Sequence, residues 1–191
     1  MNIFKITTFL FIFSGKILFG SDMIYPDLNA HFTRMKEKKQ NLIQAFPPYE
    51  ELYTNAKETS IPPSLTLPLT PLQKNLAMSL AQEWISIYKH PTATLDSKYY
   101  GARHLEQLAL LIGDHRLLSF AMDAWIFVAD DPQTNSLEAL QASDRLIRWG
   151  HIPQALNILN KIKEDRYQNL CDPRHPQCIQ DASSILDCFL N

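Results

Sequence analysis

Glycine is scarce in this chain. It occurs five times in 191 residues, and beyond residue 20 only at Gly101, Gly113 and Gly150. No Asn-Gly or Asp-Gly pair is present, although such pairs form the tight turns of β-hairpins. We also find no convincing alternation of apolar and polar residues, which is the pattern of a half-buried strand. The sequence therefore predicts an all-α fold.

Recognisable catalytic motifs are missing as well. The chain contains no Gly-x-Ser-x-Gly elbow, phosphate-binding loop or dinucleotide fingerprint. Acidic pairs such as Asp130-Asp131 lie near expected helix ends, where capping or solvation explains them. Acids that are distant in sequence can still converge in the fold, so an enzyme remains an alternative. No catalytic residue and no cofactor is predicted.

The chain also lacks an excess of basic charge. Its net charge is −2, whereas nucleic-acid-binding domains usually carry a strongly basic patch or stripe. Four cations, Arg34, Lys36, Lys38 and Lys39, share one side of an expected helix. We interpret them as a solvated helix face, with contact to an anionic surface as the alternative. No nucleic-acid partner is expected.

The first twenty residues differ from the rest. A positively charged start up to Lys5 precedes an apolar stretch from Ile6 to Phe13 and then the small pair Gly20-Ser21. This order is that of a secretory signal peptide, so we expect residues 1–20 to be removed and the protein to be secreted or periplasmic. The alternative is a retained anchor, but Lys16 interrupts the apolar run before the roughly 20 residues that a membrane span requires. No stable span is expected after signal removal.

Cysteine is absent until the C-terminal end, where Cys171, Cys178 and Cys188 occur. Export favours disulfide formation. If Cys178 and Cys188 share one helix, their separation of ten residues is about 15 Å, whereas a disulfide needs Cα atoms within about 7 Å. We therefore predict a Cys171–Cys178 disulfide, with Cys171–Cys188 as the second choice. A metal held by Cys171, His175 and Cys178 is the alternative that this compartment disfavours, and we predict no metal site.

Proline divides the chain into regions. Residues 59–71 contain four prolines, and proline both fixes φ and biases the preceding residue away from helix. We predict a Pro-rich linker over residues 59–70. It joins an N-terminal helical arm, residues 21–58, to a helical repeat domain, residues 71–191.

Apolar residues recur at helical spacing on both sides of this linker. Caps, prolines and glycines indicate where the helices begin and end. The first expected helix follows a cap at Asp27 or Asn29 and runs to about residue 45, and a short helix after Pro47-Pro48 ends near residue 57. The others cover about residues 71–89, 97–112, 116–129, a segment capped by Asn135 or Ser136 that ends near 149, 153–167 and 179–189.

Two pairs of these helices are joined by very short links. Gly113-Asp114 forms one link, and Gly150 begins the other, 37 residues later. Links this short favour antiparallel neighbours, and self-similarity at such a period is typical of stacked helical hairpins. The predicted architecture is therefore a stack of antiparallel helical hairpins.

The segment 149–156 resembles the turn of a tetratricopeptide repeat, in which a glycine closes the first helix and a small residue, here Ala155, packs early in the second. In this register Ser143 takes the family's small position, Leu146 its bulky position and Leu159 a packing position of the second helix.

A second such unit, from Ile112 to Pro132, departs from the pattern because Glu106 takes the small position and Leu118 replaces the early alanine. The resemblance covers about residues 95–167. An unrelated helical bundle shares much of this pattern and is the alternative.

The resemblance implies binding of a peptide or protein along a concave groove lined by the first helix of each pair. By that resemblance, the candidate partner-binding residues are Tyr99, Tyr100, Arg103 and Gln107. The alternative is that the tyrosines pack between helices.

The chain is thus predicted to be an exported helical-repeat adaptor for a protein or peptide. Two alternatives stay open: a small hydrolase of a helical fold, and a structural subunit of an envelope or secretion assembly.

Intact mass spectrometry of the exported protein tests the signal peptide and the disulfide together. We expect a chain that begins at Ser21 and gains the mass of one pair of hydrogens on reduction. A chain that keeps Met1 contradicts the export prediction, and a mass unchanged by reduction contradicts the Cys171–Cys178 disulfide.

Overall fold

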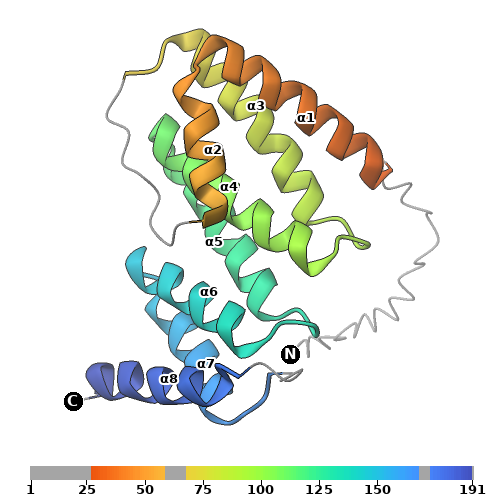
Figure 1. Ribbon diagram of the computed structural model, residues 1–191. Coiled ribbons are helices and arrows are strands. Elements are labelled where there is room, and N and C mark those ends of the chain that lie inside the picture. Colours follow the sequence, from red (N-terminus) through yellow and green to blue (C-terminus); the bar gives the residue numbers. More distant parts are fainter. Residues whose placement is uncertain (1–26, 59–67, 168–172, 191) are drawn as a thin grey trace, which may run out of the picture.

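The computed structural model describes residues 27–58, 68–167 and 173–190 (Figure 1). These residues form eight α-helices and no strand, which confirms the predicted all-α fold. The helices are α1 (Leu28–Ala45), α2 (Pro48–Glu58), α3 (Pro71–Tyr88), α4 (Leu95–Ile112), α5 (His115–Ala129), α6 (Ser136–Arg148), α7 (Ile152–Lys163) and α8 (His175–Leu190). The predicted signal peptide and most of the predicted linker lie outside the described residues.

Helices α3 to α8 form a continuous stack. Each of them packs against the next helix along the chain, and α1 with α3, α2 with α4, and α6 with α8 also meet. The ribbon in Figure 1 shows this succession from α3, through α4 and α5, to α8 at the opposite end. The predicted stack of antiparallel helical hairpins is therefore confirmed.

The residues predicted to form the turns between helices do so. Gly113 and Gly150 have φ of 73° and 79°, the left-handed conformation that glycine adopts without steric cost. Asp114 then caps α5 by accepting hydrogen bonds from two backbone amides of its first turn. At α6, Asn135 and Glu138 form a reciprocal capping box. These local contacts end one helix and start the next within a few residues.

A buried carboxylate, Glu83 of α3, holds α1 in place. It is 7% exposed and lies 2.9 Å from His31 Nδ1, 3.2 Å from Arg34 Nε and 2.5 Å from Lys38 Nζ. Burial alone would raise the pKa of Glu83, but the hydrogen bonds from Lys38 and His31 and the charges of Lys38 and Arg34 outweigh burial and lower it. The ionised carboxylate therefore stabilises the contact between α1 and α3.

A stack of side chains holds α2 against α1 and α4. Lys39 Nζ of α1 lies 3.7 Å from the ring centroid of Tyr53 in α2. The Tyr53 ring stacks on His104 of α4 at 4.0 Å, and His104 stacks on Trp84 of α3 at 4.8 Å. The predicted N-terminal arm is thus packed against the predicted repeat domain.

The basic side of α1 differs from the expected solvated face. Arg34 and Lys38 pair with Glu83, and Lys39 covers Tyr53, while Lys36 is exposed. The reason is that an acid and an aromatic ring on other helices lie opposite these cations, which the sequence of α1 alone does not reveal.

Both described cysteines lie on α8, which begins four residues earlier than the expected helix and so meets the condition of the distance argument. Cys178 is buried and Cys188 is exposed. Because Cys171 lies outside the described residues, the Cys171–Cys178 disulfide stays a prediction. None of the helices that the structure describes is both long enough and apolar enough to cross a membrane.

Replacing Glu83 by glutamine is expected to destabilise the protein by about 2 kcal/mol at neutral pH, because Arg34 and Lys38, which are partly exposed, lose the charged partner to which they donate. A carboxyl whose pKa is lowered on folding stabilises the fold fully above its unfolded pKa, about 4.3, and this contribution is lost as the pH falls through the folded-state pKa. Urea unfolding of both proteins between neutral pH and about pH 3, followed by circular dichroism, measures the difference.

Glu37→Gln is the matched control, since Glu37 is an exposed acid on α1 and its replacement should change stability little. A stability difference between Glu83→Gln and the unaltered protein that stays constant down to the lowest pH would contradict the assigned role of the carboxylate.

Candidate functional site

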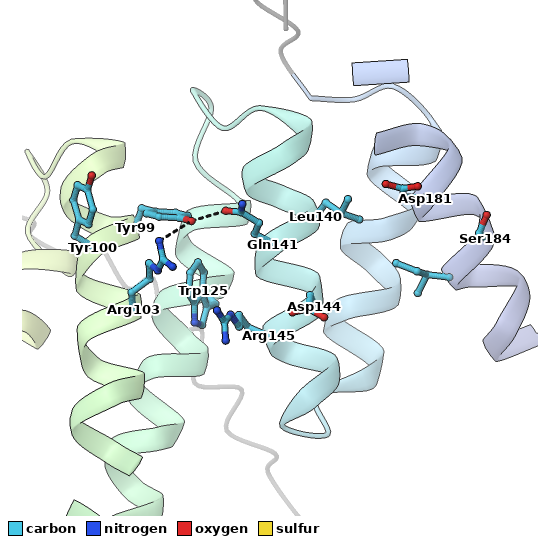
Figure 2. A pocket seen from close by; sticks show the side chains of 11 residues that line it. Tyr99, Tyr100, Arg103, Trp125, Leu140, Gln141, Asp144, Arg145, Asp181 and Ser184 are labelled. Atoms are coloured by element: carbon cyan, nitrogen blue, oxygen red, sulfur yellow. Dashed lines mark hydrogen bonds between the residues drawn. The ribbon is translucent and has the colours of Figure 1, made fainter. Parts of the chain in front are cut away.

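An open pocket of about 800 Å³ lies between α4, α6 and α8 (Figure 2). Ligand sites commonly have volumes of about 300–1,000 Å³, so this pocket is of the size that holds a ligand or a short peptide segment. Its lining residues are Tyr99, Tyr100, Arg103, Trp125, Leu140, Gln141, Asp144, Arg145, Asp181, Ser184 and Ile185.

The α4 wall contains three of the four predicted partner-binding residues. The Tyr99 hydroxyl donates a hydrogen bond to Oε1 of Gln141, which lies on α6 at the other side of the pocket. The Arg103 guanidinium lies 5.4 Å from the centroid of the Tyr99 ring, a cation–π contact. Burial raises the pKa of the Tyr99 phenol, while the ring of Tyr100 is 38% exposed. This wall thus offers aromatic surface and one guanidinium.

Gln107, the fourth predicted residue, lies elsewhere. Its side chain is buried, and its amide donates a hydrogen bond of 2.7 Å to the Leu52 carbonyl of α2. Gln107 follows Tyr99 by eight residues, which rotates its position by about 80° around a helix of 3.6 residues per turn. It therefore faces α2 and helps to fix that helix.

Beneath the pocket, a buried carboxylate connects three helices. Glu106 of α4 is 2% exposed. It accepts hydrogen bonds from the indole of Trp149 at 2.8 Å and from that of Trp125 at 3.3 Å, and Arg145 Nη1 of α6 lies 3.6 Å from it. The three contacts fix how α4, α5 and α6 lie against one another on the pocket side.

Arg145 is the second guanidinium of the pocket. It is 5% exposed, and its Nη1 atom is buried without a hydrogen-bond partner among the residues that the structure describes. Burial lowers the pKa of Arg145, the charges of Glu106 and Asp144 oppose this shift, and repulsion from Arg103 adds to it. Figure 2 shows Arg103 and Arg145 on facing helices. Glu106 and Asp144 partly offset the charge of Arg145, and Arg103 adds a second guanidinium to this side of the pocket.

Sequence reasoning missed this charged cluster. Glu106 occupies the position at which the repeat pattern expects a small residue, and Arg145 lies beside the bulky position at Leu146. One signal was present: each of these charged residues is next to residues of the apolar side of its helix, where a charge is costly unless it is paired.

Two carboxylates stand at the α6 and α8 side of the pocket. Asp144 forms an ion pair with Arg148 on the same helix, at 3.0 Å. Asp181 of α8 accepts a hydrogen bond of 2.7 Å from the Gln177 amide. No cationic side chain in the described part of the chain forms an ion pair with Asp181. Its carboxylate is hydrogen-bonded to an amide but is not neutralised by a cation.

A serine, a histidine and an aspartate also meet at the start of α8. His175 Nδ1 lies 3.0 Å from Ser136 Oγ, and its Nε2 lies 3.1 Å from Asp165 Oδ1. Serine hydrolases use the same three groups, but Ser136 is 3% exposed and does not line the pocket. The cluster therefore joins the beginnings of α6 and α8 to the end of α7.

No metal centre is found within the described ranges, since no three His, Cys, Asp or Glu side chains there are close enough to hold an ion. The alternative of a metal held by Cys171, His175 and Cys178 involves Cys171, which lies outside those ranges.

Comparison of the chain with protein-family models, with curated proteins and with solved structures finds no match. The resemblance to tetratricopeptide repeats thus stays a prediction, and function has to be inferred from the pocket.

Removing the Glu106 carboxylate is expected to destabilise the protein by about 3–5 kcal/mol in Glu106→Ala, because buried Arg145 would lose its main counter-charge. Glu106→Gln should cost less, since its amide oxygen still accepts from an indole. Urea unfolding measured by tryptophan fluorescence reports both, because Trp125 and Trp149 contact this carboxylate.

The control is Glu164→Ala, an exposed acid at the end of α7, which should leave stability nearly unchanged. Equal unfolding midpoints for Glu106→Ala and Glu164→Ala would show that the buried cluster contributes nothing.

Proposed function

We propose that this protein is an exported helical-repeat adaptor that binds a protein or peptide in the pocket between α4, α6 and α8. The observation that carries the proposal is the position of this open pocket, which is lined mainly by alternate helices of the stack. In a stack of hairpins, alternate helices form one continuous face, and repeat proteins use such extended faces to bind partners.

The composition of the pocket supports a peptide or protein ligand. Tyr99, Tyr100 and Arg103 belong to the residue types that contribute most binding energy in protein interfaces. Leu140 and Ile185 add apolar surface, and Gln141 adds an amide. This mixture of aromatic, apolar and polar groups suits the side chains and the backbone of a bound segment.

A hydrolase is the second candidate, because the pocket contains the two carboxylates Asp144 and Asp181, and hydrolases often use paired acids. Binding is favoured because Asp144 pairs with Arg148 and its side chain is 48% exposed, as in an ordinary surface ion pair. Turnover of a bound ligand that is lost in Asp181→Asn would favour the hydrolase.

Site-directed cross-linking tests the proposed binding face. A photoreactive phenylalanine analogue placed at Tyr100 is expected to become attached to a partner in the native compartment, and mass spectrometry identifies the attached peptide. The same analogue at Phe127, an exposed aromatic residue of α5 outside the pocket, should give no such product.

The captured partner is then measured with purified proteins. Tyr100→Ala should weaken its binding at least about tenfold, as expected for a contributing aromatic contact, and Phe127→Ala should not. Equal capture by both positions, or equal effects of both substitutions, would show that the partner does not bind at this pocket.

A further inference from the structure

The charges of the pocket are separated along its length. Arg103 and Arg145 lie at the α4–α6 side, and Asp181 lies on α8. Asp144, between them, is neutralised by Arg148. The pocket is thus positive at one end and negative at the other.

At the positive end, the protein itself leaves Arg145 incompletely satisfied. The 3.6 Å that separates Arg145 Nη1 from Glu106 Oε1 exceeds hydrogen-bond distance, and Nη1 has no other partner among the described residues. A buried guanidinium without its hydrogen bonds is costly. Arg103 and Arg145 both line the pocket, so an acid group bound there lies beside two guanidinium charges.

Carboxylate is the anion that fits this end. Guanidinium groups bind carboxylates through parallel N–H···O bonds, and the Tyr99 hydroxyl and the Gln141 amide stand beside Arg103 as further polar contacts. At the other end, Asp181 has acceptor capacity beyond its bond from Gln177, and it is suited to a lysine or arginine side chain.

The geometry points to a peptide segment of mixed charge as the ligand: its acidic side chain lies between Arg103 and Arg145, and its basic side chain lies at Asp181. This inference rests on the proposed function and adds the class of peptide and its orientation in the pocket. The volume of about 800 Å³ leaves room for the few residues that join the two charged side chains.

The test uses fluorescein-labelled peptides with blocked ends and fluorescence anisotropy at fixed ionic strength. The mixed-charge peptides EEAAKK and KKAAEE cover both chain directions. QQAAKK and EEAAQQ, with their reversed counterparts, remove one charge type at a time. We expect one mixed-charge peptide to bind at least about tenfold more tightly than either of its half-neutral counterparts, because each lacks one ion pair.

Removing one charge from the protein should weaken the binding of only those peptides that carry the opposite charge. Arg103→Gln should weaken the peptides that contain glutamate about tenfold and leave QQAAKK unchanged, and Asp181→Asn should weaken only those that contain lysine. Arg116→Gln and Asp123→Asn are the matched controls, since these exposed residues carry the same charges outside the pocket. They should have no effect.

Half-neutral peptides that bind as tightly as the mixed-charge ones would overturn the inference. So would an Arg103→Gln variant that weakens all peptides equally. If cross-linking at Tyr100 captures a partner while no mixed-charge peptide binds, this inference fails and the proposed function stands. If position 100 captures nothing and no peptide binds, both fail.

Discussion

The contacts of Glu106 are the constraint on which the pocket depends. Its carboxylate is buried beneath the site and accepts hydrogen bonds from tryptophans of α5 and of the α6 end, next to Arg145. A buried charge is tolerated only with partners in defined positions. These directional contacts therefore fix the relative positions of α4, α5 and α6, whereas apolar packing alone leaves helices freer to slide past one another.

A second buried acid performs the same task at the other end of the stack. Glu83 of α3 gathers His31, Arg34 and Lys38 of α1, and the neighbouring stack of Tyr53 on His104 holds α2. Helices α1 and α2 thereby cover the surfaces of α3 and α4 that would otherwise be exposed at this end of the helical stack.

The sequence was sufficient for the helices and their connections, because these depend on residues close to one another in the chain. Gly113, Asp114 and Gly150 act through local backbone geometry, so their positions predicted the hairpins correctly. The candidate wall residues Tyr99, Tyr100 and Arg103 were found through the expected first helix of a pair. Gln107 was misplaced because the rotation of α4 relative to α2 is a tertiary property. The contacts of Glu83 join two helices and those of Glu106 join three, and no single helix carries that information.

Stability and recognition are coupled at Arg145. Its burial brings it next to Glu106, but Nη1 lies 3.6 Å from the nearest carboxylate oxygen and has no hydrogen-bond partner among the described residues. Full satisfaction by a second buried acid would have stabilised the free protein and removed the attraction for a ligand. Arg103, which lines the same pocket from α4, adds its positive charge to this attraction for an anion. The partly compensated state is therefore what allows the same arginine to support the fold and to select an acidic group.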